Sequence, residues 1–566
     1  MAWIEKRNTK YEEDKAYSLF GIFDVHIPVL YGEGKQKALK RLRDKIREDY
    51  LCLAKLWSAD PRDPRVEKER IEGSKGGLVT NAYRWVFDTL DFSRWRHLPG
   101  SQLLWIKGDP GKGKTMLLCG IINELERSIV AEGGNLAYFF CQATDSRINN
   151  ATAVLRGLIY LLGYRQPRLL SHLPENTYPS DDAMAWIVLS KVLGGMLEDP
   201  NLKVTYLVVD ALDECVTDLP KLLDLIIRIS SGRVKWLLSS RNEVMIEEKL
   251  GSGNGRTRLS LELKANALQV SRAVDAYIDD KLSGLASLQH DNTLKDQVRG
   301  ILHRKANGTF LWVALVVQEL EQVKHWDLLQ AAEEFPSDLY PLYDRMVGQI
   351  QRLSRRTLEF CEAVLATAVI AFRPLFLAEL GRLSGLPEQI SGSTDDLKVI
   401  VSMCGSFLTV RDNQVYLVHQ SAKDYLSERA STLLFPRGVA TAHHSQFARS
   451  LELMSDKLQR DMYSLSAPGF PIGHVRVPDP DPLATVRYSC VYWVNHLSES
   501  VYGTKANPDD FLQDDKAVHT FFETKYLYWL EALSLIRAMS EGIIAIRQLE
   551  GLLVSMKTQT ARGLDS

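Results

Sequence analysis

Residues 103–126 have the sequence LLWIKGDPGKGKTMLLCGIINELE, and this stretch decides the fold of the chain. Its centre fits the pattern G-x-x-x-x-G-K-[ST] in full, with the residues Gly108, Asp109, Pro110, Gly111, Lys112, Gly113, Lys114 and Thr115. An apolar run precedes the pattern as a predicted strand, and an amphipathic run follows it as a predicted helix. This strand–loop–helix order is the context in which the pattern forms a phosphate-binding loop, the Walker A motif.

The residue types of this loop suit the binding of a nucleotide's phosphates. Glycines let backbone N–H groups point at phosphate oxygens, and the start of the following helix adds a favourable dipole. Lys114 is expected to reach the β and γ phosphates, and the hydroxyl of Thr115 is expected to bind Mg²⁺. The alternative is a glycine turn without a ligand. The loop contacts only what ATP and GTP share, so both remain candidates, with ADP or GDP in a resting state.

A second apolar run, Val204–Val209, ends in the acidic sequence Asp-Ala-Leu-Asp-Glu. A carboxylate at the carboxyl end of a buried strand is placed to be a second Mg²⁺ ligand, and we assign Asp210 to the metal, through water. Asp213 and Glu214 are then catalytic candidates that orient or deprotonate the attacking water, and the sequence leaves open which of them does so. Isolated acids of this kind are also common in loops.

A further predicted strand, Val234–Leu238, leads into Ser239, Ser240 and Arg241. A guanidinium at the carboxyl edge of this strand could contact the γ-phosphate, and we count Arg241 among the catalytic candidates. The alternative is a surface arginine that pairs with nearby carboxylates.

The pattern of apolar segments predicts the fold class. From about 100 to 265, apolar strand-like runs alternate with longer amphipathic segments, which indicates a parallel sheet with crossover helices. The rest is mostly helical, apart from a hairpin in which SFLTV and QVYLVH flank residues 411–413. We therefore expect an α/β P-loop NTPase followed by mostly α-helical domains, and 566 residues suit a multidomain chain.

The composition is that of an ordinary globular protein. The chain is 45% hydrophobic and 25% charged with a net charge of -2, which argues against a disordered chain and gives no reason to expect nucleic acid as a partner. Its seven cysteines are scattered without a C-x-x-C pair, so we expect neither a zinc ribbon nor a disulfide framework. No apolar stretch approaches the ~20 residues of a membrane helix. We expect a cytoplasmic protein.

Taken together, GDPGKGKT, LVVDALDEC and LLSSRN resemble the NACHT class of signal-transducing STAND P-loop NTPases. Across about 65–430 the chain is similar to the NLR-like members of fungal heterokaryon incompatibility. The supporting segments are RIEGSKGGLVTNAYRWVFD, YFFCQATDSRINNATAVLRGLIYLL and ANGTFLWVAL. The resemblance implies an NTPase domain followed by a helical domain, a winged helix and a second helical domain, with the nucleotide buried between NTPase domain and winged helix.

The resemblance also implies roles for particular residues. LVHQSAKDYL is similar to the family's histidine-containing winged-helix segment, which places His419 against the β-phosphate of a bound diphosphate. Gly76, Gly77 and Leu78 match the family stretch that packs near the base. ANGTFLWVAL lacks the proline with which many relatives contact the base, so that contact is in doubt here.

Both ends of the chain resemble parts of a longer architecture. AYSLFGIFDVHIPVLYGEGKQKALKRL is similar to the C-terminal edge of the HET effector domain, and RYSCVYWVNHL and YLYWLEALSLI are similar to helices that precede WD or ankyrin repeats. We predict, in chain order, a remnant of the HET-like edge (1–50), a linker with the N-terminal NACHT segment (51–95), the P-loop NTPase core (96–265), a helical domain (266–345), a winged helix (346–432) and a C-terminal helical domain (433–566).

These features favour a nucleotide-dependent switch over a metabolic enzyme. The hypothesis is a closed diphosphate state locked by His419 and an open triphosphate state that self-associates, with slow hydrolysis resetting the switch. Effector or sensor proteins are the other expected partners. Two alternatives remain open: a winged-helix DNA-binding regulator, and a nucleotide-binding scaffold without hydrolysis. Residues 366–430 show no basic excess, which argues against the first.

Overall fold

The computed structural model describes residues 9–20, 27–57, 63–98, 103–129, 132–174, 182–229, 233–251, 256–261, 264–465, 469–502 and 516–563. The chain divides into two compact units, Met1–Asp338 and Leu339–Ser566. Each unit is described by itself, and the finer domain boundaries expected from the sequence stay predictions. Among the described residues, none of the helices has the length and apolar character to cross a bilayer.

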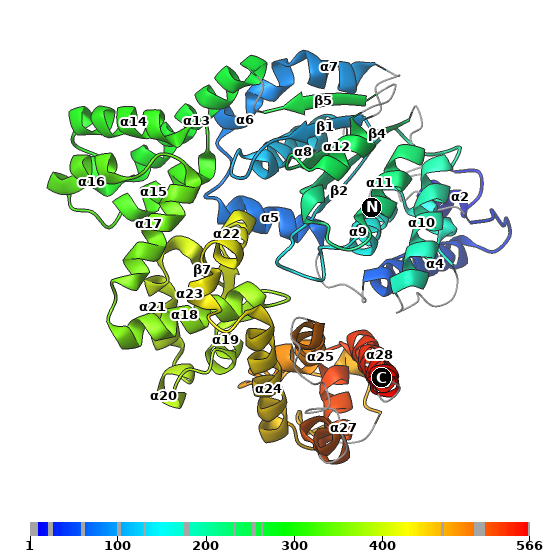
Figure 1. Ribbon diagram of the computed structural model, residues 1–566. Coiled ribbons are helices and arrows are strands. Elements are labelled where there is room, and N and C mark those ends of the chain that lie inside the picture. The colour runs from blue at the N-terminus through cyan, green and yellow to red at the C-terminus, as the bar shows by residue number, and fades with distance from the viewer. Residues whose placement is uncertain are drawn as a thin grey trace. The chain divides into compact units, whose positions relative to one another are not determined.

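The first unit is built on a five-stranded parallel sheet (Figure 1). Its strands are β1 (Leu103–Lys107), β2 (Asn135–Phe140), β3 (Thr205–Asp210), β4 (Val234–Ser240) and β5 (Arg256–Ser260). The spatial order is β2-β3-β4-β1-β5, and every neighbouring pair is parallel. β2, β3 and β4 are buried along their whole length, which explains why they are continuous apolar runs rather than alternating ones. The expected α/β class is confirmed.

Helices cover this sheet and supply its crossovers. The crossover helices are α8 (Lys114–Ile129), α9 (Ala151–Arg165), α10 (Asp182–Glu198), α11 (Leu219–Arg228) and α12 (Val244–Leu250), with short 3₁₀ turns η2 (Pro167–His172) and η3 (Leu212–Glu214) between them. The side chain of Asn150 caps α9 by accepting from the Ala153 N–H at 2.8 Å. α8 begins directly after the phosphate-binding loop, so the sheet, the loop and this helix form one continuous support.

The N-terminal segments of the first unit are helical. They comprise α2 (Asp14–Tyr17), α4 (Lys35–Trp57), α5 (Pro64–Ser74), α6 (Thr80–Tyr83), η1 (Arg84–Asp88) and α7 (Leu90–His97). The turn before α4 needs glycine, since Gly32 and Gly34 have φ of 92° and 81°. The buried Glu13 carboxylate holds this turn by accepting from both glycine N–H groups at 2.9 Å.

The first unit ends in a helical part, as expected for the residues after 266. Its helices are α13 (Lys264–Gly284), α14 (Asn292–Ala306), α15 (Phe310–Leu320) and α16 (Leu328–Glu334), with 3₁₀ turns η4 (Ala286–Leu288) and η5 (His325–Asp327). Asn307 ends α14 in the left-handed conformation, with φ of 47°. The turn that follows leads straight into α15.

The second unit starts with helices around a three-stranded antiparallel sheet of order β6-β8-β7. The elements are α17 (Leu339–Gln351), α18 (Arg355–Ile370), β6 (Leu375–Phe376), α19 (Leu377–Leu383), α20 (Glu388–Ser391), α21 (Thr394–Met403), η6 (Gly405–Phe407), β7 (Leu408–Arg411), β8 (Gln414–Leu417) and α22 (Gln420–Glu428). The predicted hairpin is β7–β8, and Asp412 and Asn413 make its turn with φ of 47° and 61°. The assignment of residues 346–432 as a winged helix stays a prediction.

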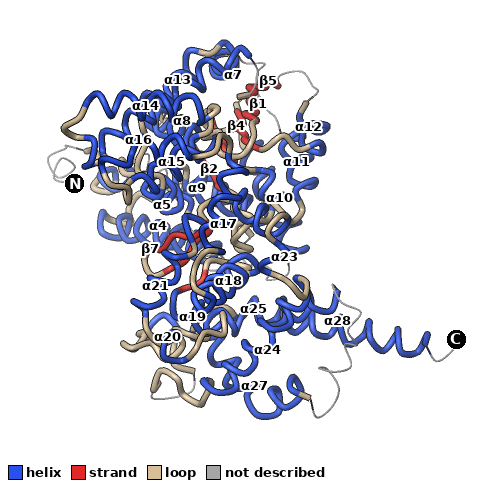
Figure 2. The backbone as a smooth tube through the Cα atoms, turned by 60° about the vertical axis from the view of Figure 1, so that its left-hand side comes forward, coloured by secondary structure: helices blue, strands red, loops and turns tan. Residues whose placement is uncertain are grey.

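The remaining elements of the second unit are helical (Figure 2). They are α23 (Ser431–Leu434), α24 (Val439–Lys457), η7 (Ile472–His474), α25 (Arg487–Tyr502), α27 (Ala517–Leu535) and α28 (Met539–Gly563). Their core contains the buried rings of Phe447, Trp493, Phe521 and Trp529. The indole N–H of Trp529 donates to the Cys490 carbonyl at 2.9 Å, so this large ring is buried without losing its hydrogen bond.

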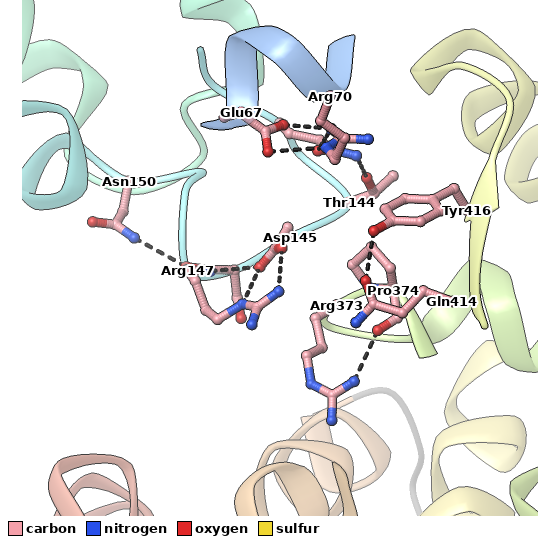
Figure 3. Close-up of polar contacts among 12 residues, drawn as sticks. Glu67, Arg70, Thr144, Asp145, Arg147, Asn150, Arg373, Pro374, Gln414 and Tyr416 are labelled. Atoms are coloured by element: carbon pink, nitrogen blue, oxygen red, sulfur yellow. Dashed lines mark hydrogen bonds and ion pairs between the residues drawn. The ribbon is translucent and has the colours of Figure 1, made fainter. Parts of the chain in front are cut away.

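A buried ion pair connects α19 with α25 inside the second unit. The Glu379 carboxylate accepts from Arg373 Nη1 at 2.9 Å and Nη2 at 2.7 Å, and from the N–H groups of Phe376 and Tyr488 at 2.9 and 3.0 Å. Arg373 also donates to the Pro374 carbonyl at 2.8 Å, as Figure 3 shows. Such a pair is tolerable in the interior because further hydrogen bonds satisfy its atoms.

Replacing Glu379 with glutamine should destabilise the second unit by about 3–5 kcal/mol, because the Arg373 charge would remain buried without its counter-ion. Urea unfolding of the full chain measures this as a lower midpoint. Glu388→Gln is the matched control, since Glu388 is 86% exposed in its pair with Arg382 and its loss should cost less than about 1 kcal/mol. Equal midpoints for the two variants would contradict the prediction.

Candidate functional site

The phosphate-binding loop lies between β1 and α8. Its conformation requires glycine at two positions, since Gly111 and Gly113 have φ of 75° and 81°. A methyl group at these two positions would also lie only 2.9 Å from the Thr309 side chain and 2.8 Å from the Phe310 ring. The Gly108 N–H donates to the Ser240 carbonyl at 3.2 Å and so fixes the loop to the end of β4.

Lys114 lies at the end of this loop and points its ammonium back over it. The ammonium donates to the Gly108 carbonyl, and to the Asp109 carbonyl at 3.1 Å. The loop therefore holds the Lys114 ammonium against its own backbone carbonyls. A cation beside a glycine-rich loop at the start of a helix is suited to phosphate oxygens.

Asp210 ends β3 at the same edge of the sheet. Burial is the largest effect and raises the pKa of its carboxyl, while hydrogen bonds from the Ser239 and Thr115 hydroxyls and the Lys114 charge lower it. The structure thus brings together Thr115 and Asp210, the two residues assigned to Mg²⁺. The sequence did not predict Ser239 as a site residue, although Ser239 directly follows the predicted strand Val234–Leu238.

A hydroxyl and a carboxylate side by side fit Mg²⁺, which prefers oxygen ligands and shares them with phosphates and water. No group of three or more His, Cys, Asp or Glu side chains suited to a metal occurs in the part of the chain that the structure describes.

The turn after β3 carries the two other acids. Ala211 adopts φ of 54°, which is strained for a residue with a side chain and is typical of functional turns. Asp213 then accepts from the Arg241 N–H at 2.9 Å and from Arg241 Nε at 3.1 Å. Arg241 is therefore paired with a carboxylate within the site, and its contact with a γ-phosphate stays a prediction.

Glu214 makes a different contact. Its carboxylate accepts from the Ala143 N–H at 3.0 Å, on the loop after β2. Burial is the main reason that its pKa is raised to about 8, and the neighbouring negative charge of Asp213 raises it further. Near pH 7 Glu214 therefore holds a proton for most of the time, whereas a general base must be ionised.

Polar contacts fix the loop that Glu214 touches (Figure 3). Asp145 is fully buried and pairs with Arg147 through two bonds of 2.8 and 2.7 Å. Arg70 on α5 pairs with Glu67 and donates to Gln142 at 3.2 Å. These contacts hold the backbone around Ala143 in place to donate to Glu214.

One further residue of the site, Asn242, could not be found from a motif, and one residue of the loop motif, Lys112, makes contacts that the motif does not indicate. Asn242 donates to the Asp109 side chain at 2.9 Å and so joins the loop to the end of β4. Lys112 donates to the Asn307 carbonyl at 2.7 Å and to the Thr309 hydroxyl at 3.3 Å, on the turn before α15. Both contacts span more than a hundred residues of sequence, where no local pattern could reveal them.

His419 belongs to the second unit and caps α22. Its Nδ1 accepts from the Ser421 N–H at 3.1 Å and lies 2.8 Å from the Ser421 hydroxyl, which in turn lies 3.0 Å from the Tyr343 hydroxyl. This ring is held by a local network. Its contact with a diphosphate stays a prediction, as do the contacts of Gly76, Gly77 and Leu78 with a base.

The raised pKa of Glu214 predicts a pH-dependent stability. Between the unfolded value near 4.5 and the folded value of about 8, the folded chain binds one proton more than the unfolded chain. The free energy of unfolding should therefore fall as pH rises through this window, by up to about 1.4 kcal/mol per pH unit. Glu214→Gln should remove this decline in urea titrations at pH 5 to 8. The control Glu124→Gln, at a side chain that is 44% exposed, should keep it, and a decline that survives in Glu214→Gln would contradict the assignment.

Comparison with known proteins places this site in context. Residues 81–241 match the family model described as Nephrocystin 3, N-terminal. The vegetative incompatibility protein HET-E-1 of Podospora anserina is 52% identical over 98% of this chain. Two solved structures from Aeropyrum pernix, those of the ORC2 and ORC1 proteins, are 12% and 15% identical and cover 66% and 67% of this chain and 96% and 98% of theirs. Their TM-scores of 0.30 and 0.29 are too low to support an argument.

The similarity to HET-E-1 runs through nearly all of this chain, but the chain spans only 42% of the length of that relative. The matched family model lies within the α/β part, over the loop, the acidic turn and Arg241. With the P-loop fold and an identity of 52%, the chain belongs to the NACHT-like incompatibility proteins, as the counterpart of about two-fifths of HET-E-1.

Proposed function

We propose that this chain is a nucleotide-dependent molecular switch of fungal incompatibility or innate-immunity signalling, which binds ATP or GTP with Mg²⁺ and hydrolyses it slowly. The observation that carries the proposal is the convergence of Lys114, Thr115 and Asp210 at one edge of the parallel sheet. An ammonium over a glycine-rich loop recognises phosphates, and the hydroxyl–carboxylate pair supplies oxygen ligands for a divalent cation.

Each charged group of the site then has a distinct part. Lys114 binds the β and γ phosphates, and a Mg²⁺ held by Thr115 and Asp210 would neutralise charge on the transferred phosphoryl group when bound. Asp213 is a positioning residue, because its two bonds fix the backbone and the guanidinium of Arg241. Arg241 is thereby kept at the edge of the site, where it can contact a γ-phosphate.

Glu214 is the candidate general base of this proposal. In hydrolysis the water gives up a proton as its oxygen bonds to the γ-phosphorus, and the bond from that phosphorus to the bridging oxygen breaks. A carboxyl with a pKa of about 8 is mostly protonated at neutral pH, so only a minor fraction is able to take this proton. Slow turnover follows, which suits a switch better than a metabolic enzyme.

A switch requires that the two nucleotides bind its two states differently. In this proposal, contacts of Arg241 with the γ-phosphate favour a triphosphate state that self-associates, and His419 favours a diphosphate state. Effector or sensor proteins in the cytoplasm would receive the signal. The order of elements around β6, β7 and β8 supports assigning this part of the second unit as a winged helix that serves the switch.

Nucleotide binding is tested by thermal unfolding of the full chain with ATP, ADP, GTP or GDP and Mg²⁺. At 100 times Kd, the bound nucleotide should stabilise the protein by about 2.7 kcal/mol, and the series identifies the base. Lys114→Ala should lose this stabilisation, because the ammonium over the loop is removed. Lys191→Ala, an exposed lysine on α10, is the control and should respond as the wild type does. No shift with any nucleotide, or a normal shift in Lys114→Ala, would refute the proposal.

Hydrolysis is tested by single-turnover assays with labelled ATP and GTP over pH 6 to 9. The rate should rise toward a plateau above about pH 8 as Glu214 ionises. Glu214→Gln should lower the plateau about 100-fold and remove the pH dependence, while nucleotide binding persists. Binding without any turnover in the wild type would instead identify a scaffold that does not hydrolyse its ligand.

A further inference from the structure

The turn between α14 and α15 contacts two functionally different parts of the first unit. On one side it meets the phosphate-binding loop, and on the other it meets the last residues before the second unit begins. Asn307 and Gly308 form this turn with φ of 47° and 67°, and the Thr309 N–H closes it onto the Ala306 carbonyl at 2.9 Å. Two consecutive left-handed residues make a compact turn with few alternative conformations.

On the loop side, the turn is held by Lys112. Its ammonium donates to the Asn307 carbonyl at 2.7 Å and to the Thr309 hydroxyl at 3.3 Å, and the Leu311 N–H lies 3.4 Å from the Gly111 carbonyl. The Gly111 backbone is so close to the turn that even a methyl group would meet Thr309 at 2.9 Å. Any change in the conformation of the loop therefore acts on the turn directly.

On the other side, the same residue contacts the end of the first unit. The Asn307 side-chain amide donates to the Asp338 carboxylate at 2.9 Å. The neighbouring Lys305 ammonium and Trp312 indole donate to the carbonyls of Phe335 and Pro336 at 2.9 and 3.0 Å. Asp338, with φ of 70°, is the last residue of the first unit and directly precedes α17, where the second unit starts.

We infer that the path Lys112–Asn307–Asp338 couples phosphate occupancy of the loop to the segment that joins the two units. The Lys112 backbone is part of the phosphate-binding loop, and its ammonium donates to the Asn307 carbonyl in the turn. The side-chain amide of Asn307 then donates to Asp338 in the joining segment. The inference rests on the proposed nucleotide binding and specifies how the bound state is transmitted.

The direction of the effect follows from electrostatics. A nucleoside triphosphate brings several negative charges within a few ångströms of Lys112, and an ammonium prefers an anionic oxygen to a neutral carbonyl. Its bond to the Asn307 carbonyl then weakens, and the turn loses part of the restraint that Lys112 provides. A less restrained turn also holds Asp338 less firmly through the Asn307 amide. The exchange of backbone amides in residues 335–342 should therefore become faster when a triphosphate binds.

A purely structural role makes a different prediction. If these bonds only help α14 and α15 to fold, the joining segment has the same exchange with and without nucleotide. Amide exchange of residues 335–342 in the full chain, with Mg²⁺ and either a non-hydrolysable triphosphate analogue or a diphosphate, distinguishes the two roles. The wild type should show a faster rate, by about threefold or more, with the triphosphate analogue only.

Two variants cut the path without touching the residues assigned to nucleotide binding. Asn307→Gly and Asp338→Gly each remove one side chain of the 2.9 Å bond at a position whose positive φ glycine accepts. Both should bind nucleotide as the wild type does, and both should lose the response of the joining segment. Asp338→Asn keeps an oxygen acceptor and should retain the response. Asn413→Gly, which replaces a left-handed asparagine in the β7–β8 turn, is the matched control.

The outcomes separate the coupling from the proposed function. A wild-type response in both glycine variants, or the absence of a response in the wild type that binds nucleotide, overturns the coupling and leaves nucleotide binding intact. Loss of the response in Asp338→Asn also overturns it, because the acceptor oxygen is still present. A wild type that binds no nucleotide refutes the proposed function, and the coupling with it. Circular dichroism of each variant checks that it is folded, and either glycine variant alone suffices for the comparison.

Discussion

The carboxylate of Asp210 is the constraint around which the first unit is arranged. It is buried at the end of β3, where burial alone disfavours its charge. Hydroxyl groups from α8 and β4 satisfy it, so three elements must be placed correctly for this one group to be tolerated. The Ser239 hydroxyl also accepts from the Ala211 N–H at 2.9 Å, which holds the strained turn after β3. The parallel sheet thus places hydrogen-bond donors around a carboxylate whose burial would otherwise be unfavourable.

Sequence predicted those features that depend on local pattern. The loop has a complete motif, and the strands are recognisable because both faces of the sheet are covered. The partners within the site depend on strand order instead. Asp213 meets Arg241 because β3 lies beside β4, and Glu214 meets Ala143 because β2 lies on the other side of β3. A motif does not specify which strands are neighbours, so the sequence left the roles of the two acids open.

The contacts of Lys112 show the same dependence on tertiary structure at longer range. In the loop motif its position accepts any residue, and its sequence neighbours give no sign of a partner. Its partner is a backbone carbonyl 195 residues away, which has no side-chain signature at all. Lysine is suited to this contact because its flexible stem carries the charge out of the loop while the backbone remains part of it.

The adjacent acids Asp213 and Glu214 illustrate how one turn produces two chemically different groups. Asp213 accepts from the Arg241 guanidinium and a backbone N–H, whereas Glu214 has one backbone donor, and desolvation together with the neighbouring negative charge raises the pKa of Glu214. The charge of Asp213 therefore orients Arg241 and, at the same time, opposes the ionisation of Glu214. An arginine that moved from Asp213 to a γ-phosphate would leave Asp213 less neutralised and make Glu214 still harder to ionise. In the proposed switch, recognition of a triphosphate and its hydrolysis would thus oppose each other in this turn, and that opposition would favour a long-lived triphosphate state.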